Sequence, residues 1–68
     1  MTITVQVNDA RMELAPGASL LAVLAELGID GRGTAIAVNG EVASRSEWQT
    51  TTLADGDRVE VLTVAQGG

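Results

Sequence analysis

Cysteine, histidine and lysine are absent from the 68 residues, and Trp48 is the only aromatic side chain. Without cysteine the chain can form no disulfide, thiolate nucleophile or iron–sulfur cluster. Without histidine it lacks the commonest acid–base group and metal ligand at neutral pH. A chain this short also has little room for both a scaffold and an enclosed active site. These absences argue against a self-sufficient enzyme and against a metal or cofactor held by this chain.

Positive charge is also scarce, since four arginines are the only basic side chains and the net charge is −5. Nucleic-acid-binding proteins normally carry a concentrated basic footprint, which is missing here. The N-terminus lacks the basic start and long apolar run of a signal peptide, and no stretch approaches the roughly 20 apolar residues of a membrane span. We expect one soluble, acidic, cytoplasmic domain over residues 1–68, without nucleic-acid or membrane partners.

The N-terminal third has the period-two alternation of strands with one buried face. Residues 2–7 place Ile3, Val5 and Val7 on one side, and residues 11–14 do the same with Met12 and Leu14. Only the short turn-forming segment 8–10 separates the two runs. The pattern predicts a β-hairpin.

A helix of about ten residues is predicted next. Ser19 is a good N-cap, and Gly28 supplies the left-handed residue that commonly ends a helix. Between them, apolar residues recur at the three- and four-residue spacings of one helical stripe: Leu20, Val23, Leu24 and Leu27.

The second half predicts a third strand over residues 35–38, stopped by Asn39-Gly40, and a last strand over residues 58–64. Residues 41–53 are polar and irregular, a loop or a short strand, and residues 55–57 form a turn. A right-handed crossover would make the first and last strands parallel neighbours. We therefore predict an α+β β-grasp (ubiquitin-like) fold, a mixed sheet of four to five strands with one main helix packed on one face.

The chain ends in Gly67-Gly68. A terminal carboxylate becomes a good electrophile only as a mixed anhydride, and glycines would let the tail thread into a partner's nucleotide site. The four tail residues 65–68 span roughly 13 Å when extended. Their low apolar content predicts a flexible tail. Chance or a cloning remnant would also explain two terminal glycines.

Four segments together resemble one known family, the sulfur carriers of thiamine biosynthesis (ThiS). They are Asn39-Gly40-Glu41-Val42, Arg45-Ser46-Glu47-Trp48, residues 53–61 (LADGDRVEV) and Gly67-Gly68. Asp-Gly-Asp and the diglycine also occur in the small subunit of molybdopterin synthase. The Arg-Ser-Glu-Trp segment is more discriminating, and that sister family tends to be longer, with prolines before its diglycine.

The resemblance implies a carrier that acts as a co-substrate of partner enzymes. A ThiF-type adenylating enzyme would use ATP to adenylate the Gly68 carboxylate, a persulfide sulfur would convert it to a thiocarboxylate, and a ThiG-type thiazole synthase would take the sulfur. Gly68 supplies the reacting group and Gly67 the clearance. ATP and the persulfide donor belong to the partners, and the free domain is expected to be monomeric.

A docking surface is predicted beside the tail. If Val59 and Val61 face the helix, alternation places Leu62 and Val64 on the open face, unless a twist or bulge buries them again. We predict that Leu62, Val64, Ala65 and Gln66 bind the partner, and that Asp57 and Glu60 steer it towards a basic rim.

Three further interpretations accompany these predictions. Trp48 is expected to close the core edge, and Asp55-Gly56-Asp57 to form a turn rather than a calcium loop. The missing lysines indicate either a preference for arginine or protection of an activated acyl group from amines. Three functions remain as alternatives to the thiazole carrier: a molybdopterin-type carrier, a ubiquitin-like protein modifier and a plain interaction module.

Overall fold

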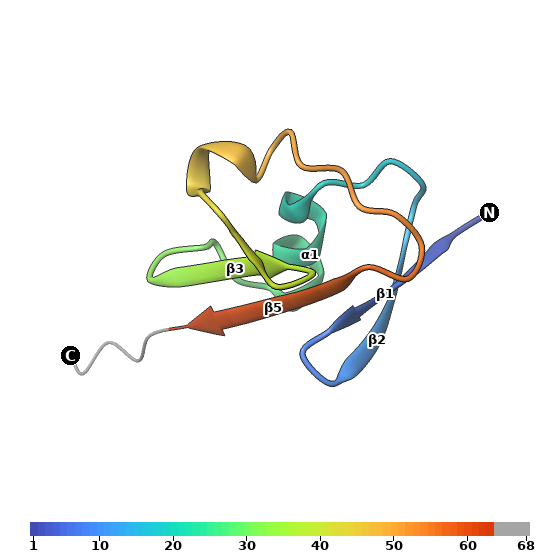
Figure 1. Ribbon diagram of the computed structural model, residues 1–68, viewed down its shortest axis with the longest axis horizontal. Coiled ribbons are helices and arrows are strands. Elements are labelled where there is room, and N and C mark those ends of the chain that lie inside the picture. The colour runs from blue at the N-terminus through green and yellow to red at the C-terminus, as the bar shows by residue number, and fades with distance from the viewer. Residues whose placement is uncertain (64–68) are drawn as a thin grey trace.

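The computed structural model describes residues 1–63 and contains five strands, one α-helix and one 3₁₀ helix (Figure 1). In chain order they are β1 (Ile3–Val7), β2 (Ala10–Leu14), α1 (Leu20–Leu27), β3 (Thr34–Val38), β4 (Glu41–Ala43), η1 (Arg45–Glu47) and β5 (Arg58–Thr63). Among these residues no helix has the length and apolar character needed to cross a bilayer.

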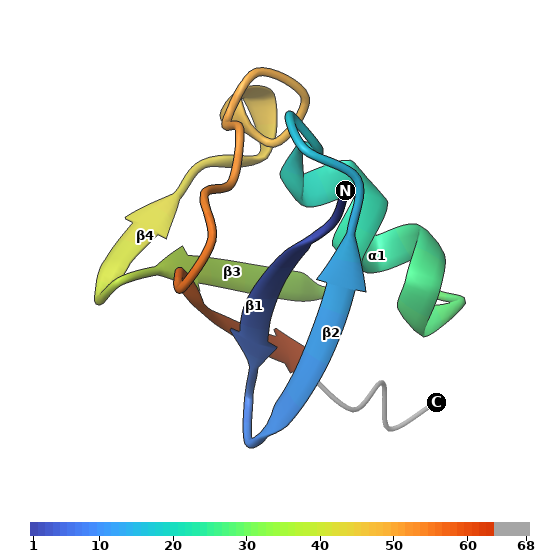
Figure 2. The same ribbon diagram turned by 90° about the vertical axis from the view of Figure 1, so that its right-hand side faces the viewer.

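All five strands form one mixed sheet in the order β2-β1-β5-β3-β4. β1 pairs antiparallel with β2, and β3 pairs antiparallel with both β4 and β5, whereas β1 and β5 run parallel, with Val7 opposite Val59. The predicted parallel neighbours and the predicted β-grasp class are confirmed. Figure 2 shows α1 lying against one side of this sheet, so the other side is left open.

The helix begins and ends at the predicted residues. The Ser19 hydroxyl accepts a hydrogen bond from the Leu21 amide at 3.2 Å, and Gly28 has the left-handed φ of 75°. The stripe is buried at its start but not at its end, because Leu27 is 42% exposed. Ile29, two residues further on, packs against the core instead. Leu27 therefore belongs to the predicted apolar stripe but not to the buried core.

The core lies between α1 and the covered face of the sheet. Its fully buried members are Val5, Leu20, Val23, Ile36 and Val59, each at most 1% exposed. Such side chains each contribute about 1.5–3 kcal/mol of transfer free energy, which a small domain needs to offset chain entropy.

Trp48 closes one edge of this core, as predicted. It is 4% exposed, and its indole nitrogen donates to the Ala43 carbonyl at 3.0 Å. The Arg45 guanidinium lies 5.4 Å from the ring centroid. Gly31 packs on the ring so closely that an added Cβ would lie 2.8 Å from it. Much of the Arg-Ser-Glu-Trp segment is therefore explained by packing.

The Asp55-Gly56-Asp57 turn ties the start of β5 to its neighbours. Asp55 accepts a hydrogen bond from the Thr4 amide at 2.8 Å, and the Gly56 amide donates to the Thr4 carbonyl. The Asp57 carboxylate accepts from the Asn39 side chain and from the Ala54 amide. These bonds explain both aspartates as turn residues, as predicted.

Candidate functional site

β5 carries the chain towards its C-terminus. Its last residue, Thr63, pairs with Thr34 at the start of β3, and residues 64–68 follow directly. The predicted site residues Gly67 and Gly68 lie outside the described part of the chain, as do Val64, Ala65 and Gln66. The structure does describe the end of β5 that precedes these residues and the sheet surface around it.

Leu62 lies on the open face of the sheet, as alternation predicted. The pairing of β5 with β3 runs without interruption from Val38–Val59 to Thr34–Thr63, so no bulge reverses the alternation. Val59 is 1% exposed on the covered face, whereas Leu62 is 68% exposed. The alternative that Leu62 is buried again is therefore excluded.

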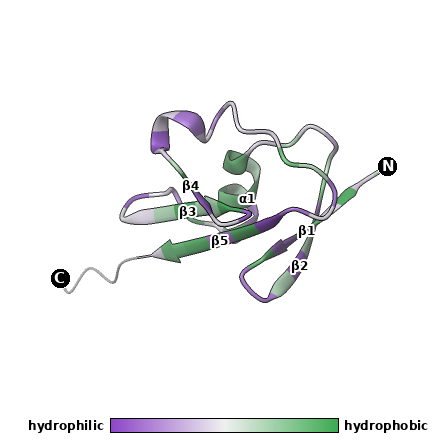
Figure 3. Cartoon of the chain, viewed as in Figure 1, coloured by the Kyte–Doolittle hydropathy of each residue, from purple (hydrophilic) through white to green (hydrophobic). Residues whose placement is uncertain are grey.

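Leu62 belongs to an apolar patch that spans three strands. Leu62 lies directly opposite Ala35, and Ala37, two residues along β3, lies opposite Val42 of β4. Val42 is 79% exposed. We call Ala35, Ala37, Val42 and Leu62 the open-face patch. Figure 3 shows the hydrophobic colour along β3 and at the end of β5.

The far part of the same face is polar. Cross-strand pairing groups Gln6 with Arg11 and Arg58, and Thr4 with Glu13. The open face is therefore divided into a polar part over β1 and β2 and an apolar part over β3, β4 and the end of β5. The apolar part lies at the end from which the tail extends.

The sequence-based interpretation did not include Ala35, Ala37 and Val42 in the docking surface. The missed signal was Asn39-Gly40, which was taken to end a strand. Their φ values of 51° and 87° are both left-handed, the conformation of a two-residue hairpin turn. A hairpin there implies a following strand, and its register places Val42 opposite Ala37.

Asn8 holds β5 in place just before the patch. It has a left-handed φ of 56°, and its side chain makes both hydrogen bonds of a strand partner to the backbone of Val61. The Asn8 Oδ1 accepts from the Val61 amide at 2.9 Å, and its Nδ2 donates to the Val61 carbonyl at 3.2 Å. These bonds extend the contact between the β1–β2 hairpin and β5 beyond Val59 to Val61.

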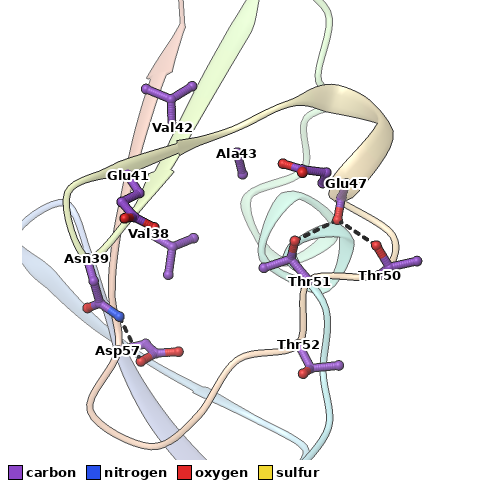
Figure 4. A pocket seen from close by; sticks show the side chains of 10 residues that line it. All are labelled: Val38, Asn39, Glu41, Val42, Ala43, Glu47, Thr50, Thr51, Thr52 and Asp57. Carbon is purple, nitrogen blue, oxygen red and sulfur yellow. Dashed lines mark hydrogen bonds between the residues drawn. The ribbon is translucent and has the colours of Figure 1, made fainter.

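A hollow of about 650 Å³ lies between β4 and residues 50–52, and the patch residue Val42 is one of its lining residues (Figure 4). The Thr50 and Thr51 hydroxyls both donate to the Glu47 carbonyl, and the Asn39 side chain donates to Asp57. Its polar groups are thus largely paired with each other. It borders the Asn39 turn and Asp57, at the opposite end of β5 from Thr63.

The comparisons with known proteins agree with this geometry. The sequence model of the ThiS family matches residues 5–68, which include the diglycine. The chain belongs to the ThiS family. A relative from Escherichia coli named sulfur carrier protein ThiS is 31% identical over 61 residues, covering 90% of this chain and 92% of that protein.

A second relative is a thiazole synthase from Paramagnetospirillum magneticum. It is 29% identical over 62 residues, which are 91% of this chain but only 19% of that protein. The ThiS-like segment is therefore a small part of a longer chain there.

Solved structures confirm the fold. The crystal structure of the thiamine biosynthesis protein ThiS from Geobacter metallireducens matches with a TM-score of 0.79 and 29% identity, covering 97% of this chain and all of that one. A ubiquitin from Caldiarchaeum subterraneum matches with a TM-score of 0.58 and 23% identity over the whole of this chain. The second match shows that the β-grasp architecture is shared with ubiquitin.

Proposed function

We propose that this chain is a sulfur carrier of thiamine biosynthesis whose working group is the C-terminal carboxylate of Gly68. The observation that carries the proposal is the ThiS family match, which continues through Gly68. The geometry supports it, because the last strand ends beside an exposed apolar patch and leaves five residues to reach a partner. In this proposal the partner binds the folded domain, and the C-terminal residues enter the partner's active site.

The proposed chemistry takes place in the partner enzymes. A carboxylate oxygen of Gly68 attacks the α-phosphorus of ATP, and pyrophosphate leaves. The terminal sulfur of an enzyme persulfide then attacks the carbonyl carbon, and AMP leaves. A thiol of the partner system cleaves the resulting acyl disulfide, which releases the thiocarboxylate and forms a new disulfide. This chain supplies only its C-terminal carboxylate to these steps, as expected of a co-substrate without cysteine or histidine.

Two enzyme partners are proposed. The first is a ThiF-type adenylating enzyme that supplies the ATP site. The second is a ThiG-type thiazole synthase that receives the sulfur. The Paramagnetospirillum magneticum relative supports the second, because there a segment similar to this chain is joined to a protein named thiazole synthase. Proteins that are fused in one organism often act together as separate chains in another.

The docking surface proposed for the adenylating enzyme is the open-face patch together with Val64, Ala65 and Gln66. Gly68 can enter a partner's nucleotide site only if that partner lies within reach of Thr63. Five extended residues reach roughly 17 Å. A partner this close covers the end of the sheet and therefore Leu62. Burying Leu62 there contributes about 1.5–3 kcal/mol in transfer terms.

The function is tested by incubating the purified chain with the adenylating enzyme, ATP and a persulfide donor, and then measuring its intact mass. A carrier gains the mass of one oxygen-to-sulfur exchange, and a chain without Gly68 gains nothing. A larger adduct on a second protein would indicate a modifier. An unchanged mass of the complete chain would contradict the carrier function.

A further inference from the structure

Glu60 lies at the border of the open-face patch, in the central strand of the sheet. It is directly opposite Ala37 and two residues before Leu62, so all three share the open face. The side chain is exposed. A surface that covers the patch therefore also covers Glu60.

The Glu60 carboxylate is available for a partner. Within residues 1–63 the only ion pair joins Arg32 and Asp30, and no hydrogen bond to the Glu60 side chain is formed. Asp57 differs, because its two oxygens accept from Asn39 and from the Ala54 amide. Two acidic residues were predicted to steer a partner. Asp57 already accepts hydrogen bonds within its turn, so Glu60 is the one whose carboxylate can bind a partner.

The surface is hollowed on both sides of Glu60. A hollow of about 230 Å³ is formed with Asn39, Gly40 and Arg58. A second hollow, of about 340 Å³, is formed with Asn8, Asp9, Val61 and Leu62. A long side chain from a partner can therefore reach the carboxylate while its neighbours pack on Leu62.

We propose that Glu60 is a specificity-determining residue of the docking surface and accepts hydrogen bonds from an arginine or lysine of the adenylating enzyme. This inference rests on the proposed function. The enzyme is the occupant because it must bring Gly68 into its nucleotide site and so covers the end of β5. Its complementary charge is expected to be positive, since this chain carries a net charge of −5.

Specificity follows from desolvation. When the patch becomes dry, the Glu60 carboxylate loses water, and a partner without a matching cation leaves it buried and unpaired. A partner with that cation gains a charge-assisted bond in a low-dielectric setting. A partner that offers only an apolar surface therefore binds more weakly than one that also offers a cation. The Glu60 carboxylate thus discriminates between these two kinds of partner.

The test compares Glu60→Gln and Glu60→Lys with Glu13→Gln, using calorimetric titration against the adenylating enzyme at low and high salt. Glu13 is the matched control, because it is an exposed glutamate on the same face but in β2, in the polar part. We expect Glu60→Gln to weaken binding about tenfold and Glu60→Lys more, with Glu13→Gln near wild type. The salt dependence of binding should also fall in Glu60→Gln. All three melting temperatures should stay near the wild-type value.

Equal affinities of Glu60→Gln and Glu13→Gln for the enzyme would overturn the inference, whether both variants bind like the wild type or both bind tenfold more weakly. The sulfur-loading assay on the wild-type chain separates this from the proposed function. If the wild type gains sulfur but Glu60→Gln binds normally, only the role of Glu60 fails. If the wild type neither binds the enzyme nor gains sulfur, the proposed function fails as well.

Discussion

The two faces of β5 have opposite chemical environments within a few residues of one strand. On the covered face Val59 is 1% exposed and packs under the helix; on the open face Leu62 is 68% exposed and faces solvent. Both are aliphatic, and the uninterrupted pairing with β3 alone determines which face each occupies. Aliphatic residues of β5 therefore stabilise the fold on the covered face, whereas on the open face they are accessible to a partner.

The largest expected effect is on stability and comes from the covered face. Ile36→Ala removes a side chain that is 1% exposed and should lower the free energy of unfolding by about 2–5 kcal/mol. In so small a domain this approaches the whole stability. The matched variant Leu62→Ala should change it by less than about 0.5 kcal/mol. Urea denaturation measures both, and similar losses would show that the two faces are not distinct.

The next effect is on binding and comes from the open face. Leu62→Asp should weaken affinity for the adenylating enzyme by about ten- to a hundredfold, because an apolar contact is lost and a charge must be desolvated. Its melting temperature should shift only slightly. Titration and thermal melts decide this together. Normal affinity with a large loss of stability would place Leu62 in the core.

A smaller effect on stability is expected at Asn8, whose side chain is hydrogen-bonded to the backbone of β5. Asn8→Gly keeps the left-handed backbone but removes both side-chain hydrogen bonds to Val61, at a cost of about 1 kcal/mol. Amide hydrogen exchange at Val61 should accelerate more than exchange at Val59. Equal acceleration at the two amides would mean that Asn8 supports the whole sheet rather than the end of β5.

The smallest effect tests how far the open-face patch extends. Val42→Ala should weaken enzyme binding by no more than about fivefold, because only two carbon atoms are removed from an exposed side chain. Stability should not change measurably. An affinity unchanged by Val42→Ala but reduced by Leu62→Asp would restrict the docking surface to β5 and β3.

The fold was largely predictable because its local signals agree with its long-range pairing. The helix start at Ser19 and its end at Gly28 depend on neighbours in sequence, and so does the alternation of β5. β4 was harder, because three residues carry little periodicity and its pairing depends on how the Asn39-Gly40 turn closes. The exposure of Leu27 was not predictable, because spacing gives the side of a helix on which a residue lies but not whether that residue is covered.

The candidate site was predictable in part. Alternation placed Leu62 on the open face, and the structure confirms that exposure. The other patch residues, Ala35 and Ala37 in β3 and Val42 in β4, come from two further strands that only the strand register brings together with Leu62. The availability of Glu60 also needed the structure, because sequence does not show that Asp57 is engaged by Asn39.

The most direct test of the central claim locates the sulfur. After reaction with the adenylating enzyme, ATP and a persulfide donor, fragment mass spectrometry should place a single oxygen-to-sulfur exchange on Gly68. Gly67→Val should melt like the wild type yet gain no sulfur, because a bulky residue obstructs entry of the tail. An exchange elsewhere in the chain, or full loading of Gly67→Val, would contradict the account.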